Sequence, residues 1–241
     1  KKNDSIFERH EVKFLLDPEQ RRVIDELIKD RMRPDEHGES TICNIYYDTP
    51  DFRLVRRSLE KPLYKEKLRL RSYGPVGPDE NVFLELKKKY NGVVYKRRIS
   101  IKESAAEAYL GGRTPLPKQS QIGREIDYFL RFYKNLRPAV YLCYDRSPFF
   151  AADGSDLRMT FDRNIRWRCD RLSLTDDTDG RQILAPGQSL LEVKTSGAMP
   201  LWLVEAFDKN DIRKISFSKY GMAYTTMLKE RLNDGKGVFC A

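Results

Sequence analysis

Ten residues decide how this chain is expected to fold: Tyr64-Lys65-Glu66-Lys67-Leu68-Arg69-Leu70-Arg71-Ser72-Tyr73. Successive side chains of a β-strand point to opposite faces, so residues two apart share a face. One face of this stretch therefore carries four cations, Lys65, Lys67, Arg69 and Arg71. The opposite face is mainly apolar. Because like charges in such a row repel unless something negative lies among them, the stretch predicts a strand that meets an anion.

The same alternation recurs in the other stretches that read as strands. Charged side chains at period two are Arg9, Glu11 and Lys13; Glu85, Lys87 and Lys89; Lys96 and Arg98; Arg158 and Asp162; and Glu192 and Lys194. One interpretation is that each charged face is the solvated side of a half-buried antiparallel sheet. The other is that the charged faces line an enclosed interior. Solvated faces usually mix charge signs with Ser, Thr and Gln, so the runs of like charge favour the enclosed interior.

Periodicity and turn residues predict the order of the elements. Strands are expected at 7–16, 41–47, 64–73, 82–90, 93–101, 139–146, 157–162, 165–169 and 190–195. Helices are expected at 18–32, 51–59, 121–135, 200–208 and 218–232. Asp17-Pro18-Glu19-Gln20 is typical of a capped helix start, and Asn91-Gly92 predicts a tight hairpin.

The helices indicate how these strands are covered. Three of them, at 18–32, 121–135 and 218–232, carry an apolar stripe that must pack on something. If they cover the apolar strand faces, the charged faces lie inside, and a closed barrel leaves no edge strand exposed. We therefore expect an α+β fold: a closed antiparallel β-barrel with a charged interior, surrounded by helices. With no internal repeat or linker, residues 1–241 are expected to form a single domain.

The composition of the chain limits the class of binding partner and the kind of site that are expected. The 45 basic and 36 acidic side chains give a formal charge of +9, and 40% of the residues are hydrophobic, so a folded protein with a polyanionic partner is expected. The four cysteines form no CxxC pair and only two histidines are present, which argues against a zinc site. No apolar run is long enough to span a membrane. An intracellular, cytoplasmic location is expected.

The acidic residues among the cations suggest two roles. Glu-x-Lys occurs on three predicted strands, at Glu11-Val12-Lys13, Glu85-Leu86-Lys87 and Glu192-Val193-Lys194. These carboxylates could hold the lysines through salt bridges, or they could ligate Mg²⁺ or Mn²⁺ together with phosphate oxygens. The sequence contains no phosphate-binding P-loop, no dinucleotide-binding glycine motif and no kinase signature, which disfavours the common nucleotide folds.

Taken together and in order, several motifs resemble the catalytic domain of the vacuolar transporter chaperone (VTC) family, polyphosphate polymerases of the triphosphate tunnel metalloenzyme (CYTH-like) superfamily. The motifs are the opening Arg9 to Phe14, the stretch quoted above, Glu85-Leu86-Lys87, Tyr144-Asp145-Arg146 with Arg158 twelve residues later, Leu191-Glu192-Val193-Lys194, and Ser216 to Tyr220. The resemblance covers nearly the whole chain. Its basic residue in the Lys-x-Ser-Lys pattern falls on Ser216 here, which is a departure from the family.

The resemblance implies an eight-stranded tunnel in which the γ-phosphate of ATP passes to a growing polyphosphate chain, assisted by Mn²⁺ or Mg²⁺. Catalytic roles are implied for Arg69, Arg71, Arg146, Arg158 and Lys219. Phosphate binding is implied for Lys13, Lys87, Arg98 and Ser218, with Tyr144 beside Arg146, and metal binding for Glu192. The charged rows add Lys67 and Lys194 as candidates for phosphate binding, and the Glu-x-Lys pattern adds Glu85 and Glu11 as candidates for metal binding. Ser218 is also a suitable helix N-cap, and a helix amino terminus attracts anions.

Three functions remain open at this point. They are a polyphosphate polymerase, a hydrolase of tripolyphosphate or nucleoside triphosphate, and a polyphosphate-binding domain without catalysis. The expected partners are ATP and polyphosphate or pyrophosphate. Nucleic acid is not expected, because the basic groups lie opposite apolar faces and form no surface stripe with exposed aromatics. The chain lacks the membrane segments of eukaryotic relatives, so a separate membrane protein is the expected partner, at the cytoplasmic face of a membrane.

Overall fold

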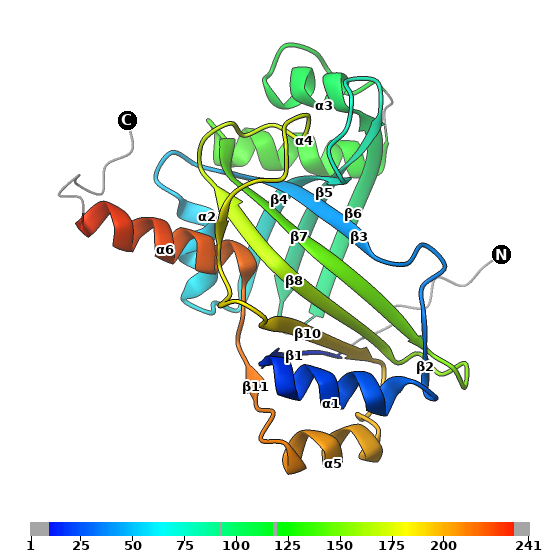
Figure 1. Ribbon diagram of the computed structural model, residues 1–241. Coiled ribbons are helices and arrows are strands. Elements are labelled where there is room, and N and C mark those ends of the chain that lie inside the picture. Colours follow the sequence, from blue (N-terminus) through cyan, green and yellow to red (C-terminus); the bar gives the residue numbers. More distant parts are fainter. Residues whose placement is uncertain (1–9, 92, 118–119, 234–241) are drawn as a thin grey trace. The chain divides into compact units, whose positions relative to one another are not determined.

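The computed structural model describes residues 10–91, 93–117 and 120–233, which form two compact units. The first unit takes Lys1–Ser40, Tyr144–Ile165 and Leu184–Phe217, and the second takes Thr41–Cys143, Arg166–Ile183 and Ser218–Ala241. Each unit thus joins three separate segments of the chain, as the colours of Figure 1 show. The expected single domain over residues 1–241 stays a prediction.

The first unit is an antiparallel sheet with two helices. Its strands are β1 (His10–Leu16), β2 (Met32–Pro34), β10 (Ser189–Thr195), β11 (Lys214–Ile215), the second half of β7 (Arg137–Ala151) and most of β8 (Arg158–Arg168). The strand β1 pairs with β10 and β11, β10 also pairs with β8, and β2 pairs with the end of β7. The helices are α1 (Pro18–Ile28) and α5 (Leu201–Lys209).

One face of this sheet packs on the helices. Phe14 and Leu16 of β1 and Val193 of β10 are buried in one apolar cluster with Ile24 of α1 and Phe207 of α5. The capping box predicted at Asp17 and Gln20 is present, so α1 begins at Pro18 as expected. The helix ends at Ile28, earlier than predicted, because Met32 already begins β2.

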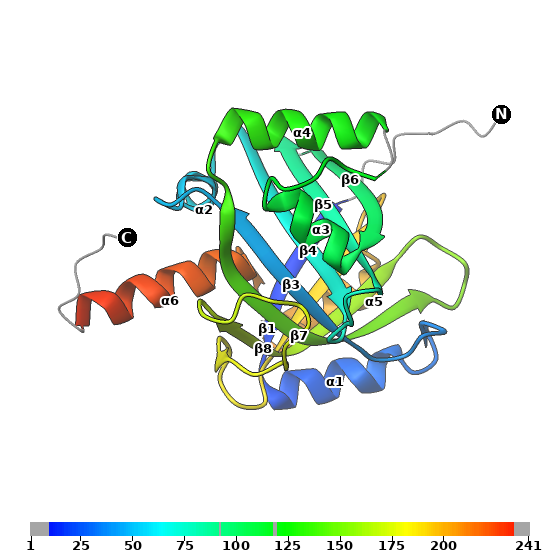
Figure 2. The ribbon, with the colours of Figure 1, turned by 90° about the horizontal axis from the view of Figure 1, so that it is seen from above.

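The second unit has the strands β3 (Ser40–Asp48), β4 (Tyr64–Tyr73), β5 (Asn81–Tyr90), β6 (Val93–Lys102) and β9 (Arg181–Gln182). Its helices are α2 (Arg53–Leu59), α3 (Glu103–Leu110), α4 (Gln121–Tyr133) and α6 (Lys219–Asn233). The strands β3, β4, β5 and β6 pair in that order, all antiparallel, and β9 pairs with the end of β8. Figure 2 shows α3 and α4 lying against this sheet.

The helices again cover the apolar strand face. Leu68 and Leu70 of β4 and Leu84 of β5 are buried in one cluster with Ile126 and Phe129 of α4. The charged row of β4 therefore lies on the face away from these helices. This arrangement confirms, within each unit, the predicted division between an apolar face under helices and a charged face opposite.

The order of hydrogen-bonded strands is β11-β1-β10-β8-β7-β3-β4-β5-β6, with β2 and β9 attached to its side. The fold is thus a helix-covered antiparallel α+β structure. Its two terminal strands, β11 and β6, are not paired with each other among the described residues, so the predicted closed barrel is not confirmed. No helix in the described ranges is both long and apolar enough to cross a membrane.

Two expectations about the elements need correction, and a third cannot be compared with the structure. The strands predicted at 157–162 and 165–169 form one strand, because Asn164 adopts a left-handed conformation (φ 50°) without ending it. The helix α3 was not predicted, since it follows β6 without a turn residue between them. Positions 7–9 of the opening strand and Gly92 of the predicted hairpin lie outside the described residues.

Candidate phosphate-binding and metal-binding clusters

The charged face of the second unit gathers four cations around one acid. We call this group the β4–β6 cluster: Arg69 and Arg71 from β4, Glu85 from β5, and Lys96 and Arg98 from β6. The strand register explains it, because Glu85 is the direct neighbour of Arg69 on one side and of Arg98 on the other.

Glu85 is fully buried and holds its cations at short range. The shortest separations from its carboxylate are 2.6 Å to Arg69 Nη2 and 2.8 Å to Lys96 Nζ, followed by 3.3 Å to Arg98 Nε and 4.0 Å to Arg71 Nη1. Burial alone would raise the pKa of this carboxyl, but the charges of Arg69 and Lys96 outweigh it and lower the pKa to about 2.

Two arginines of the cluster retain unused hydrogen-bond donors. Among the described residues, Arg71 Nε and Arg98 Nη2 are buried without a hydrogen-bond acceptor, and Arg98 Nε makes its 3.3 Å ion pair with Glu85 without hydrogen-bond geometry. The guanidinium of Arg98 lies 3.6 Å over the Phe83 ring, and that of Arg71 lies 4.9 Å over the Tyr73 ring. Four positive charges against one negative charge, with buried N–H groups unpaired, form a surface that an anion would satisfy.

The start of α6 adds further polar groups to the second unit. Lys67 Nζ donates to Ser218 Oγ at 2.9 Å, and Ser218 Oγ also accepts from the Gly221 N–H at 3.1 Å. Ser218 is therefore the N-cap that the sequence predicted, and Lys219 is buried directly after it. Tyr46 Oη, 3.4 Å from Arg69, has its pKa lowered: burial raises it, but the charges of Arg69, Lys67 and Lys219 prevail.

A buried carboxylate fixes this helix start. Tyr220 donates to Asp48 Oδ2 at 2.8 Å, and its ring stacks on Tyr46 with centroids 4.6 Å apart. Asp48 is fully buried and also accepts from the backbone N–H groups of Thr49, Leu54 and Val55. These bonds hold the first turns of α2 and α6 to the end of β3.

The first unit carries a second cluster, with equal numbers of acids and bases. We call it the β1–β10 cluster; its members are Glu11, Lys13, Arg146, Asp162, Glu192 and Lys194. Lys13 and Lys194 each lie between Glu11 and Glu192, at 3.3 to 3.6 Å from both carboxylates. The register explains this pairing, because Glu11 opposes Lys194 and Lys13 opposes Glu192 across β1 and β10.

Arg146 connects the remaining acids of this cluster. Its guanidinium makes a two-pronged contact with Asp162, at 2.6 and 2.7 Å, and approaches Glu192 at 3.3 Å. Asp162 is fully buried and Glu192 is 5% exposed. Paired geometry of this kind offsets part of the cost of burying charge, and it fixes the direction of the Glu192 carboxylate.

The predicted metal ligands differ in their suitability. In the described part of the chain, no three Asp, Glu, His or Cys side chains converge in a way that could cage a metal. Glu85 is occupied by cations on both oxygens. Glu11 and Glu192 share two ammonium groups, which shows that the space between them is suited to positive charge. That geometry fits a hard cation held by one or two carboxylates together with substrate oxygens.

Comparison with known proteins identifies the family of the chain. The family model described as the VTC domain matches residues 8–228. The chain belongs to the VTC domain family. A comparison with curated proteins gave no match.

Solved structures share the fold of this VTC domain at low sequence identity. A proposed adenylate cyclase of Bacillus halodurans has a TM-score of 0.52 and 16% identity, covering 86% of this chain and 92% of its own. A proposed adenylyl cyclase of Hippeastrum, whose structure is reported with a dominant triphosphatase activity, has a TM-score of 0.52 and 15% identity, covering 90% and 95%. At such identities the similarity concerns the fold alone.

The structure brings most of the predicted site residues of the VTC domain into the two clusters. Arg158 is an exception: it is exposed, and its guanidinium lies 4.8 Å over the Phe150 ring. Tyr144 is buried with its ring 5.2 Å from the Arg146 guanidinium, and Lys87 is the strand neighbour of Lys67 and Lys96. Roles for all of these residues remain predictions.

Three residues of the VTC domain clusters were not assigned to the site from sequence. Lys96 and Asp162 belong to the charged rows at period two, and that signal could have included them. Tyr46 lies in a stretch without charge alternation, Ile45-Tyr46-Tyr47, where nothing marks one tyrosine as the partner of an arginine. Its position follows from the pairing of Tyr46 with Arg69 across β3 and β4.

Proposed function

We propose that this protein is a metal-dependent polyphosphate polymerase, transferring the γ-phosphate of ATP to the end of a polyphosphate chain. The observation that carries the proposal is the set of unused N–H donors on Arg71 and Arg98 in the β4–β6 cluster. A buried donor without an acceptor costs about 1–3 kcal/mol, and phosphate oxygens would supply the missing acceptors. The proposal includes an enclosed tunnel for the phosphates.

Phosphoryl transfer suits a site with this composition. A terminal oxygen of the acceptor polyphosphate attacks the γ-phosphorus, the bond from the γ-phosphorus to the bridging oxygen breaks, and ADP leaves with that bond's electrons. The acceptor oxygen carries no proton near neutral pH, so no general base is needed. The protein must position the phosphates and offset the charge on the equatorial and leaving oxygens.

Within this reaction the cluster residues have distinct tasks. Arg71 and Arg98 grip phosphate oxygens, with Arg69 held in place by Glu85. Lys67, Ser218 and Lys219 present an ammonium group, a hydroxyl and a helix amino terminus to a further phosphate. Arg146, Lys13 and Lys194 belong to the other cluster and orient Glu192. Arg158 is proposed as a phosphate contact on the family pattern alone.

The metal proposal rests on the β1–β10 cluster. Glu192 and Glu11 would hold Mn²⁺ or Mg²⁺ by carboxylate oxygens, with Lys13 and Lys194 turning toward phosphate when the metal binds. The metal would supply charge neutralisation on the transferring phosphate. Glu85 does not fit this role, because its oxygens already contact four cations. We propose instead that Glu85 orders the arginines.

The test is an incubation of the purified protein with ATP and Mn²⁺, followed by separation of the products by length. A ladder of long phosphate chains is the expected result. Replacing Arg71 and Arg98 together by alanine should abolish the ladder, whereas alanine at the exposed Arg124 of α4 should leave it unchanged. Release of orthophosphate without any chain of four or more phosphates would refute the polymerase.

A triphosphate hydrolase is the second candidate. It is favoured by the fold shared with the Hippeastrum protein, whose dominant activity is that of a triphosphatase. The same clusters would bind the substrate, and water would take the place of the acceptor phosphate. Glu192→Gln distinguishes an enzyme from a binding domain without catalysis. In a binding domain the substitution should leave tripolyphosphate binding intact, and neither protein should turn over substrate. In an enzyme it should abolish turnover. A separate membrane partner and a cytoplasmic position remain predictions.

A further inference from the structure

Two lysines face each other at the outer end of the basic row. Lys65 of β4 is the direct strand partner of Lys89 of β5, and the next pair on the same face is Lys67 with Lys87. Like charges directly opposite each other in a sheet are destabilising. Lys61, in the turn that precedes β4, adds a third charge close enough to Lys65 to affect its ionisation. We call Lys61, Lys65 and Lys89 the lysine rim.

The lysine rim lacks an acidic partner within the described ranges. Among the residues that the structure describes, none of its three members forms an ion pair with a carboxylate, whereas the neighbouring β4–β6 cluster is organised around Glu85. Lys65 is half-buried, and its ammonium contacts the Ser58 carbonyl at 3.4 Å. Burial, followed by the charges of Lys89 and Lys61, lowers the pKa of Lys65.

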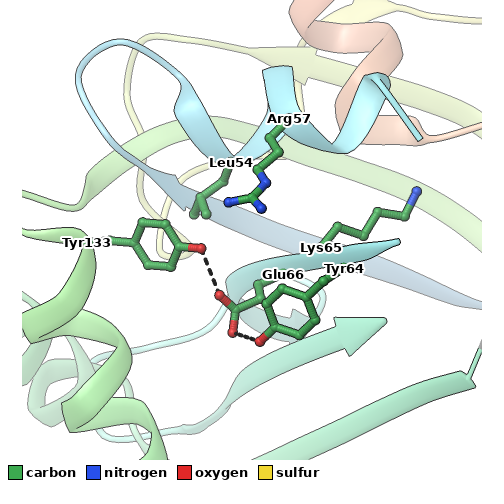
Figure 3. Close-up of a pocket in the computed structure, with 6 residues that line it drawn as sticks. All are labelled: Leu54, Arg57, Tyr64, Lys65, Glu66 and Tyr133. Carbon is green, nitrogen blue, oxygen red and sulfur yellow. Dashed lines mark hydrogen bonds between the residues drawn. The ribbon is translucent and has the colours of Figure 1, made fainter. Parts of the chain in front are cut away.

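The nearest acid on β4 is already committed elsewhere. Glu66 accepts hydrogen bonds from the hydroxyls of Tyr64 and, at 2.8 Å, of Tyr133. These groups line a small pocket with Leu54, Arg57 and Lys65. Figure 3 shows the Lys65 side chain extending away from this carboxylate, as expected for neighbours on opposite faces of a strand. Glu66 is therefore not the counter-charge of the lysine rim.

We propose that the lysine rim binds the phosphates of a polyphosphate chain beyond those held in the β4–β6 cluster. The row Lys65, Lys67, Arg69 and Arg71 runs along one face of β4, so a chain that occupies the cluster has a continuous cationic track to the rim. A nucleotide or tripolyphosphate bound in the β4–β6 cluster is too short to reach the lysine rim. The rim thus selects for long polyanions, and this inference rests on the proposed function.

The test compares two ligands with one double variant. Lys65→Gln combined with Lys89→Gln keeps most of the side-chain length and removes two charges. We expect tripolyphosphate to bind as in the unchanged protein, while long-chain polyphosphate binds roughly tenfold more weakly. The slope of the logarithm of long-chain affinity against the logarithm of salt concentration should also become shallower, by about one for each lost phosphate contact. Isothermal titration at several salt concentrations measures both quantities.

A matched control separates this effect from net charge. Lys29→Gln combined with Lys88→Gln also removes two positive charges, but outside the basic row. Lys88 lies 3.9 Å from Glu125 on the helix-covered side. The control should bind both ligands unchanged. Equal long-chain affinity in the rim variant and the control would overturn the rim while leaving the proposed function standing. Absence of tripolyphosphate binding by the unchanged protein would overturn both.

A lipid headgroup could offer the same phosphate chemistry. Vesicles containing phosphatidylserine, and control vesicles of phosphatidylcholine alone, form the second arm of the test. We expect the rim variant and the unchanged protein to sediment equally with each. Loss of binding to phosphatidylserine vesicles, with long-chain polyphosphate affinity unaffected, would assign the rim to a membrane surface and overturn the proposal.

Discussion

Replacing Glu85 by glutamine removes the single negative charge of the β4–β6 cluster at almost constant shape. The carboxyl is fully buried, and its pKa is lowered from an ordinary 4.5 to about 2. A drop of about 2.5 pH units corresponds to about 3 kcal/mol at 1.36 kcal/mol per unit. Because the folded state holds the charged form more tightly than the unfolded state does, this stabilisation is present above pH 4.5 and disappears as the pH falls through about 2.

Urea unfolding of the two proteins at a series of pH values measures this effect. At pH 7, Glu85→Gln should lower the free energy of unfolding by about 3 kcal/mol, with a fall in melting temperature of roughly 6–12 °C for a chain of this size. The difference between the variant and the unchanged protein should narrow as the pH is lowered below 4.5, since Glu85 of the unfolded state then takes up a proton while the folded state still holds the charge, and it should vanish below about pH 2, where both states are protonated.

A control variant on the helix-covered side of the sheet measures how much a partly exposed ion pair contributes to the free energy of unfolding. Glu125 contacts Arg97 at 3.2 Å and Lys88 at 3.9 Å with a quarter of its side chain exposed, so Glu125→Gln should cost less than about 1 kcal/mol. Equal stability of Glu85→Gln and the unchanged protein at pH 7 would refute the electrostatic account of the cluster. So would a difference that stays constant down to pH 3.

Three further perturbations test the supporting residues. Arg146→Ala leaves the two acids that Arg146 holds without their shared cation and should cost about 3–5 kcal/mol in urea unfolding at pH 7; a loss below 1 kcal/mol would contradict the pairing. Tyr220→Phe removes the hydroxyl that donates to buried Asp48 and should cost about 1.5–3 kcal/mol, with Tyr95→Phe as an exposed control. Glu192→Gln should remove stimulation of turnover by Mn²⁺, while tripolyphosphate affinity without metal is kept; unchanged stimulation would exclude Glu192 as a ligand.

The sheet was predictable wherever charge alternates strictly. The bounds of β4 were predicted to the residue, and β5 and β6 to within one residue at each end, because Lys, Arg and Leu at period two leave a single register. The capped start of α1 was equally clear from Asp17 and Pro18. Strand β8 was divided wrongly, since Asn164 resembles a turn residue and only backbone pairing shows that the strand continues.

The composition of the clusters was harder to predict than their existence. Alternation along a strand indicates the face of the sheet on which a side chain lies. The ion pairs, in contrast, depend on the register between strands that are distant in sequence. Arg146, Asp162 and Glu192 come from three strands and are up to 46 positions apart, so their association requires the tertiary structure. The reinterpretation of Glu85 as an organiser of cations arises in the same way, from four contacts that no single strand reveals.

The interleaved segments have a consequence for how this protein is made. The unit that contains β3 to β6 also contains α6, whose first turn is anchored to Asp48 at a separation of 172 positions. During synthesis, that unit lacks the α6 anchor until the helix has left the ribosome, even though its strands emerge much earlier. The cationic face of the unit is exposed to solvent in the interval, so a polyanion present at that stage is expected to change the yield of folded protein.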